Sequence, residues 1–230
     1  MSSPTPERLA DDLAVPPLEN GDFLTRDEFE RRYEAMPHIK KAELIEGIVY
    51  MTSPLKADHG IPHAKIGAWL SVYSASTAGT IVLDNVSYRI DQDNEFQPDL
   101  ILMIAPERGG RARIDKDGCV EGAPELIVEV ASSSTSKDLH QKFNVYRRAG
   151  VQEYCVWQVR DRAIAWWELR AGRYEPLPAD ADGVLRSRIF PGLWLDAPAL
   201  LRGDMLAVLE RLQAGLRAPE HAAFIAQIGA

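Results

Sequence analysis

The sequence predicts an α/β fold, a mixed β-sheet flanked by helices, with a C-terminal helical extension. Three observations predict it. Short aliphatic runs bounded by turn residues indicate strands over 81–90, 99–104 and 125–130. A strand, a helix and a second strand follow one another over 125–159, which is typical of a βαβ unit with parallel strands. The hairpin pattern of EYCVWQV and AIAWWEL adds antiparallel strands, so the sheet is expected to be mixed.

The composition is that of an ordinary globular protein. The chain has 230 residues, of which 46% are hydrophobic and 26% are charged. Its net charge of −8 argues against a high-affinity nucleic-acid binder that relies on neutralising phosphates. No apolar run reaches the roughly 18 residues of a membrane span, and the N-terminus lacks the pattern of a secretory signal. Two cysteines, Cys119 and Cys155, are too few for a disulfide framework, so we expect a cytoplasmic protein.

The first third of the chain predicts a tail and two helices. Residues 1–21 contain several prolines and indicate a flexible N-terminal tail. Thr25 and Glu28 have the spacing of a capping box, which predicts a helix over 26–36. The stretch AELIEG then indicates a short helical turn followed by a hairpin. Apolar residues at helical spacing predict a longer helix over 61–77, starting at about Pro62.

The second half predicts a helix, a hairpin and a helical end. A helix over 135–149 is expected to stop at Gly150, a residue type that favours the left-handed cap. Leucine and methionine spacing predicts an amphipathic helix over 197–216, and Pro219 opens a last short helix. The expected parts are the tail, a main domain and the helical extension, over residues 1–21, 22–195 and 196–230.

Two acidic residues occupy unusual positions in apolar strands. Asp99 stands at the start of one strand, and Glu129 lies inside ELIVEV. Buried carboxylates are costly unless they are paired or bind a metal ion. Alternation along the strand places Glu129 on the face opposite the apolar core face. A structural role stays open for each residue, because a carboxylate at a strand end also caps loops or pairs with arginine.

A lysine on the following helix points to the same place. Leu139, Phe143 and Tyr146 form the apolar stripe of the predicted helix. Lys142 lies only about 60° from Leu139 on a wheel of 100° per residue, at the edge of this stripe. We therefore expect its ammonium group to be directed at the carboxylates of the sheet. The alternative is a side chain that snorkels along the apolar surface to water.

The segments ELIEG, PDLIL, ELIVEVASSST and KFNVYRRAGVQEY, in this order, resemble the Uma two family of putative restriction endonucleases. This family belongs to the PD-(D/E)XK nuclease superfamily, and the resemblance covers roughly residues 22–195. It implies a restriction-endonuclease-like fold. It also implies an enzyme that hydrolyses DNA phosphodiester bonds with Mg²⁺ or Mn²⁺ as cofactor.

The resemblance implies a role for each matching acid. Asp99 corresponds to the acid of the PD motif and Glu129 to the acid of the (D/E)XK motif, so both are expected to be catalytic and to hold the metal. Glu43 or Glu46 corresponds to an acid on an early helix, and Glu43 is favoured as the third catalytic, metal-binding residue. Mg²⁺ prefers oxygen ligands and keeps several waters, so a few carboxylates suffice.

The chain departs from the family pattern at one position. Ala131 stands where the lysine of the (D/E)XK motif is expected, and Lys142 on the neighbouring helix is the candidate that replaces it. A lysine beside the attacking water offsets developing negative charge. The alternative function, favoured by Ala131 and by the acidic net charge, is a catalytically inactive PD-(D/E)XK-fold module that binds or regulates.

Weaker candidates remain near the predicted site. His59 and His63 are four residues apart, which suits a zinc hydrolase if the segment is helical, and His59 could instead approach the site from a loop. The backbone of residues 132–134 either contacts a phosphate or caps the next helix. Gln141 neighbours Lys142 on the outer side of the helix.

Two features bear on packing and partners. Trp157, Trp166 and Trp167 are expected to pack in the core or at a dimer interface rather than to stack on bases. The C-terminal amphipathic helix either closes the core or packs on a second subunit, and a homodimer is favoured by analogy with relatives that need two sites to cut a duplex.

Overall fold

The structure is a computed structural model that describes residues 15–51, 56–132 and 137–229. The chain divides into two compact units, Met1–Ser53 with Ile90–Phe96 and Pro54–Arg89 with Gln97–Ala230. Most of the predicted tail, residues 1–14, lies outside the described residues. Within the described ranges, every helix is too short or too polar to cross a membrane.

The first unit is a small helix-and-hairpin structure around its own core. It contains α2 (Arg26–Glu34), β1 (Ala42–Ile45), β2 (Ile48–Met51) and β5 (Asn94–Phe96). Strand β1 pairs antiparallel with both β2 and β5. Glu46 and Gly47 connect β1 to β2 with φ angles of 49° and 79°, as a two-residue type I′ turn requires. Phe29 of α2 and Leu44 of β1 are completely buried in this core.

Two local predictions for this unit are wrong. The stretch AELIEG forms β1 and its turn instead of a helical turn, so Glu43 lies on a strand. The capping box does not form, because the Thr25 side chain makes no capping hydrogen bond. The Glu28 carboxylate instead accepts hydrogen bonds from Arg31 and Arg32, and these two side chains lower its pKa to about 2.

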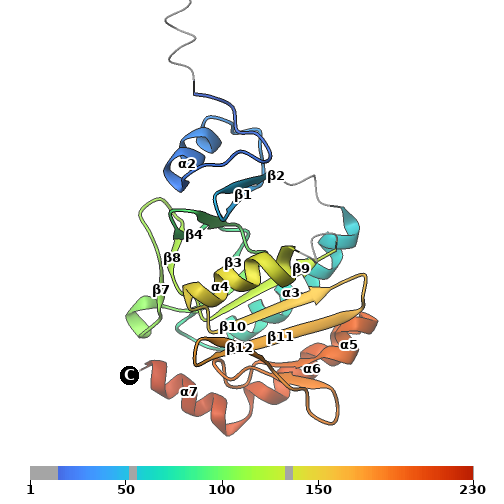
Figure 1. The fold of residues 1–230 in the computed structure, drawn as a ribbon. Helices are drawn as coiled ribbons and strands as arrows, with labels where there is room; N and C mark the ends of the chain where they lie inside the picture. The colour runs from blue at the N-terminus through green and yellow to red at the C-terminus, as the bar shows by residue number, and fades with distance from the viewer. Residues whose placement is uncertain (1–14, 52–55, 133–136, 230) are drawn as a thin grey trace, which may run out of the picture. The chain divides into compact units, whose positions relative to one another are not determined.

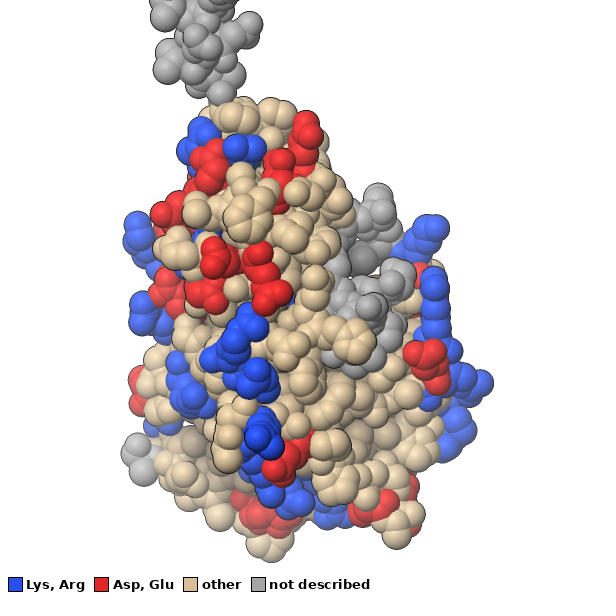
Figure 2. Space-filling model, in the orientation of Figure 1, with Lys and Arg blue, Asp and Glu red and all other residues tan. Residues whose placement is uncertain are grey.

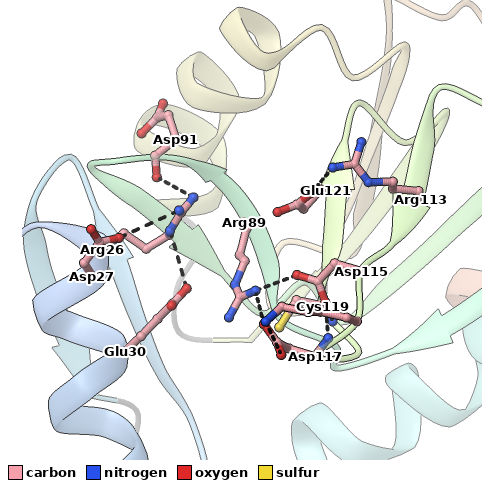
Figure 3. A network of polar contacts seen from close by, with 11 residues as sticks. Arg26, Asp27, Glu30, Arg89, Asp91, Arg113, Asp115, Asp117, Cys119 and Glu121 are labelled. Carbon is pink, nitrogen blue, oxygen red and sulfur yellow. Dashed lines mark hydrogen bonds and ion pairs between the residues drawn. The ribbon is translucent and has the colours of Figure 1, made fainter.

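Each unit contains an arginine that organises an ion-pair network (Figure 3). In the first unit, Arg26 pairs with Glu30 and donates a hydrogen bond to the carbonyl oxygen of Asp91. It thereby ties helix α2 to the segment that contains β5. In the second unit, Arg89 pairs with Asp115 and so holds the turn that follows β7 (Ala112–Ile114).

The second unit is built on a six-stranded mixed sheet with the strand order β12-β11-β10-β9-β6-β3 (Figure 1). Its strands are β3 (Thr80–Asp84), β6 (Leu100–Ile104), β9 (Leu126–Ala131), β10 (Glu153–Gln158), β11 (Ala163–Arg170) and β12 (Arg173–Pro176). Strands β9 and β10 are parallel, and all other neighbours are antiparallel. The predicted βαβ unit, the hairpin after it and the mixed sheet are therefore confirmed.

Helices and short strands complete the second unit. The helices are α3 (Ala57–Ala75), the 3₁₀ turn Pro106–Arg108, the π-helical segment Lys137–Lys142, α4 (Phe143–Ala149), α5 (Ala197–Arg202), α6 (Met205–Leu216) and α7 (Pro219–Gly229). The short strands are β4 (Tyr88–Asp91), β8 (Val120–Gly122), β13 (Val184–Arg186) and β14 (Trp194–Asp196). Strand β8 pairs with β7 and with the start of β4, and β13 pairs with β14.

The C-terminal helical extension is confirmed, with one difference. Two helices, α5 and α6, replace the single helix expected over 197–216. Gly203 ends α5 with a φ angle of 81°, and the Asp204 side chain then caps α6 by accepting a hydrogen bond from the amide of Ala207. A left-handed glycine followed by an N-cap is enough to break the chain into two helices.

Helices cover both faces of the sheet (Figure 1). On one face, Trp69 and Tyr73 of α3 pack in a core with Val128 of β9. On the other face, Tyr146 of α4 packs against Tyr154 of β10, with ring centroids 5.0 Å apart. The predicted core face of β9 is confirmed. The tryptophans predicted to pack in the core do so: Trp157 and Trp166 are buried, and Trp167 packs against Phe143.

Helix α3 begins earlier than the sequence indicated. It starts at Ala57, so Pro62 lies inside it, and the predicted start at about Pro62 is wrong. Because Pro62 has no amide hydrogen, the helix lacks one hydrogen bond, that to the carbonyl oxygen of Asp58, but it continues through this position. His59 and His63 consequently lie one turn apart on the same helix, and their rings stack with centroids 5.7 Å apart.

Candidate active site

The two predicted acids are neighbours in the sheet of the second unit. Strands β6 and β9 are antiparallel, with Leu100 opposite Val128, so the register brings Asp99 beside Glu129. The amide nitrogen of Asp99 lies 3.4 Å from Oε2 of Glu129. Each acid is only 3% exposed. The sheet therefore joins two buried carboxyl groups that are 30 residues apart in the sequence.

Two donors hold one oxygen of Asp99. The amide of Val130 donates a hydrogen bond of 2.7 Å to Oδ2, and Nε2 of His59 lies 3.3 Å from the same atom. His59 is 7% exposed, in the first turn of α3. The helix that starts earlier than predicted therefore carries His59 to the carboxylate, so the expected approach from a loop is wrong.

Two donors from the opposite helix hold Glu129. Nζ of Lys142 and the hydroxyl of Tyr146 each donate a hydrogen bond of 2.9 Å to its Oε1 atom. Lys142 is 3% exposed, so the predicted direction of its ammonium group is confirmed and the snorkelling alternative is wrong. Lys142 is the last residue of the π-helical segment, a geometry that is frequent at functional sites.

The charges in this cluster favour a cation. Asp99 and Glu129 supply two buried carboxyl groups, and Lys142 is the buried ammonium that faces them. Lys142 pairs with Glu129 and His59 lies beside Asp99, and such partners are what buried ionised carboxylates need. Their oxygens are the hard ligands that Mg²⁺ and Mn²⁺ accept. No cluster of three or more Asp, Glu, His or Cys side chains suited to a metal occurs in the described ranges, but Mg²⁺ retains water ligands and needs few side chains.

The two histidines of α3 both face Asp99. Nε2 of His63 lies 3.2 Å from the carbonyl oxygen of Asp99 and 3.3 Å from Oδ1 of Asp84. Nδ1 of His59 is buried and, within the described part of the chain, has no hydrogen-bond partner. No group of three or more Asp, Glu, His or Cys side chains suited to a metal includes His59 among the described residues, which favours its contact with Asp99 over a role as zinc ligand.

The remaining predicted residues belong to other elements of the chain or lie outside the described residues. Glu43 is buried on β1 in the first unit, and Glu46 occupies the turn of that hairpin. Ala131 is completely buried at the end of β9. Gln141 is partly exposed on the segment before α4. Of the backbone at 132–134, residues 133 and 134 lie outside the described residues, as does the side chain of Leu139 in the predicted stripe.

Sequence reasoning treated Tyr146 only as part of an apolar stripe. Its hydroxyl contacts Glu129, and its ring packs against Tyr154. The available signal was the residue type, because a buried tyrosine, unlike phenylalanine, needs a partner for its hydroxyl group. Tyr146 also stands four residues after Lys142, which places the two side chains on one helix face.

Another buried acid, Glu153, has a structural role away from this cluster. Its carboxylate accepts hydrogen bonds from the amide of Arg188, the hydroxyl of Ser187 and the indole of Trp166. It thereby anchors the loop before β14 to strand β10. Burial raises its pKa from 4.5 to about 7, against the opposing effect of these hydrogen bonds.

This shift predicts a pH-dependent stability. The folded protein holds the Glu153 proton more tightly than the unfolded chain does. The contribution of the protonated Glu153 side chain to the unfolding free energy is therefore complete below about pH 4.5 and is lost as the pH rises through 7. In urea titrations between pH 4.5 and 8, the unfolding free energy of the wild type should fall by on the order of 1 kcal/mol per pH unit. This fall should be absent in Glu153→Gln. Glu107→Gln, which changes an exposed glutamate, is the control; equal slopes in wild type and Glu153→Gln would contradict the prediction.

The mixed sheet, the helices on both faces and the C-terminal helices define a restriction-endonuclease-like α/β protein. Residues 26–198 match the Uma2 family, described as putative restriction endonuclease, and the chain belongs to this family. A crystal structure of a putative nuclease belonging to DUF820 from Anabaena variabilis is similar, with a TM-score of 0.56 at 14% sequence identity. The similarity covers 82% of this chain and 99% of that chain. No curated protein matches the sequence.

Proposed function

We propose that this protein is a PD-(D/E)XK endonuclease that hydrolyses DNA phosphodiester bonds with Mg²⁺ or Mn²⁺. The observation that carries the proposal is the buried pair of Asp99 and Glu129 with Lys142 bound to one of them. Membership of a family described as putative restriction endonucleases supports the same reaction class.

Each residue of the cluster has a chemical role in this proposal. Asp99 and Glu129 hold the metal, which when bound lowers the pKa of a coordinated water and stabilises charge on the phosphoryl oxygens. Lys142 orients the attacking water and offsets the negative charge that develops during attack. Tyr146 fixes the Glu129 carboxylate through the oxygen that Lys142 also contacts. Glu43 is proposed as a further acidic residue of the reaction, and a homodimer as the assembly that cuts both strands.

The alternative function is an inactive module of the same fold that binds or regulates. It was favoured by Ala131, since a lysine is expected at that position. Lys142 reaches Glu129 from the π-helical segment before α4, so the cluster contains a lysine although the motif position does not. This contact favours the enzyme over the inactive module.

A cleavage assay tests the proposal. Supercoiled plasmid and single-stranded DNA are incubated with purified protein and Mg²⁺, Mn²⁺ or a chelator. We expect nicking with either ion and none with the chelator. Absence of cleavage in every condition, together with absence of Mn²⁺ binding in calorimetry, would contradict the enzyme and support the inactive module.

His59 is predicted to position Asp99 for metal binding. Removing its Nε2–H donor with His59→Leu should weaken Mn²⁺ affinity about 10-fold, since partners that orient metal ligands typically contribute 10- to 100-fold. His59→Gln can present an amide nitrogen to Asp99 and should retain affinity within about threefold. Calorimetric titration with Mn²⁺ measures both, and His38→Leu, an exposed histidine of the first unit, is the control. Wild-type affinity in His59→Leu would exclude this role.

A further inference from the structure

The turn between β10 and β11 lies at the same edge of the sheet as the carboxylates. Strand β10 runs parallel to β9, with Val156 beside Glu129. The amide of Val159 donates a hydrogen bond of 3.0 Å to the carbonyl oxygen of Ala131, so the turn starts where β9 ends. Three residues separate Val156 from Val159, which places the start of the turn about 10 Å beyond Glu129 along the strand direction.

This turn presents two arginines to solvent. Arg160 and Arg162 are exposed, and Arg162 has a φ angle of 50° that closes the turn. Among the described residues, neither arginine makes an ion pair, in contrast to Arg170, which pairs with Glu168 at the other end of β11. Asp161 lies between them in the sequence, so the three residues together carry a net charge of +1. Figure 2 shows Lys and Arg side chains gathered where Figure 1 draws this end of the hairpin.

The position of these arginines is significant because the chain as a whole is acidic. A net charge of −8 repels a polyanionic substrate, so affinity has to come from local groups near the reacting atoms. Exposed arginines without a partner are suited to this, since the guanidinium group binds phosphate oxygens through two parallel hydrogen bonds. Because the turn starts about 10 Å beyond Glu129, an arginine side chain there can reach the phosphates that flank the scissile bond but not the scissile bond itself.

We propose that Arg160 and Arg162 bind the phosphates of the nucleic-acid backbone that flank the bond positioned at Asp99 and Glu129. This inference rests on the proposed nuclease function and assigns the part of the surface that holds its substrate. The distance of about 10 Å corresponds to about three phosphates along one strand, at 3.4 Å of helix rise each. The contacts are to the backbone, so they are independent of base sequence.

Binding of a fluorescent DNA duplex of about 20 base pairs, measured by anisotropy in chelator at several salt concentrations, tests the proposal. The double variant Arg160→Gln/Arg162→Gln should bind about 10-fold more weakly. Its plot of log affinity against log salt should be less steep by about 1 to 2, since each phosphate contact contributes about 0.9. Arg170→Gln/Arg173→Gln removes the same charge at the opposite edge of the sheet and should bind within twofold of wild type.

The outcomes separate this inference from the proposed function. If the wild type cleaves and binds DNA, and the two double variants lose affinity equally, the turn has no special role and the inference fails alone. If the wild type neither binds nor cleaves DNA in any condition, the proposed function fails as well. Both variants change exposed side chains, and circular dichroism with a thermal melt verifies that they remain folded.

Discussion

Asp99→Asn should abolish metal-dependent cleavage of DNA, with a loss of roughly 10³-fold or more in rate. Asparagine keeps the shape of the side chain and an oxygen that can face the amide of Val130. It removes the charge that the metal needs, so metal affinity and cleavage should fall together. Initial rates of plasmid nicking and calorimetric titration with Mn²⁺ measure the two effects.

The stability of Asp99→Asn distinguishes a chemical defect from a folding defect. Asp99 and Glu129 are like charges in a buried cluster, so removing one charge should leave the unfolding free energy unchanged or raise it. Urea denaturation measures this. Cleavage at the wild-type rate by a folded Asp99→Asn protein would show that the reaction uses other residues.

Lys142→Met should affect both activity and stability. The Lys142 and Glu129 side chains are 4% and 3% exposed, with 2.9 Å between Nζ and Oε1. Removing one partner of a buried ion pair leaves an uncompensated charge, which typically costs about 3–5 kcal/mol. We expect a loss of this size in the unfolding free energy, measured in urea in the absence of metal, and loss of cleavage.

The double variant Lys142→Met/Glu129→Gln separates the two effects. Without either charge, the cluster should regain most of the lost stability, while cleavage should stay absent because a metal ligand is missing. A double variant as unstable as Lys142→Met would contradict the ion-pair explanation. Retained cleavage in a folded Lys142→Met protein would contradict the role of Lys142 as the displaced lysine.

The structural features that were predicted from patterns of neighbouring residues were predicted correctly. Alternation along ELIVEV assigned Leu126, Val128 and Val130 to the core and Glu129 to the opposite face, as the structure has it. Helical spacing correctly predicted that the Lys142 side chain faces the sheet, although Lys142 ends a π-helical segment and does not lie in a regular α-helix. Gly150 ends α4 in the left-handed conformation that its residue type favours.

Predictions that depended on weak local signals failed. AELIEG became a hairpin strand because Glu46 and Gly47 supply the positive φ angles of a type I′ turn. The start of α3 was placed too late because Pro62 was treated as a barrier, although the helix continues through it. Thr25 and Glu28 have the right spacing for a capping box, but Arg31 and Arg32 compete successfully for the carboxylate.

The sequence by itself determined the fold class, through the order of its strand and helix patterns. It also singled out Asp99, Glu129 and Lys142 as candidate site residues, because each departs from the polarity expected at its position in a strand or helix. Only the tertiary structure decided their partners. The antiparallel register of β6 and β9 sets Asp99 beside Glu129. The docking of α3 brings His59 to Asp99, and the docking of α4 brings Tyr146 to Glu129. Periodicity tells which face a side chain occupies, but contacts between distant segments depend on register and packing, which no local pattern contains.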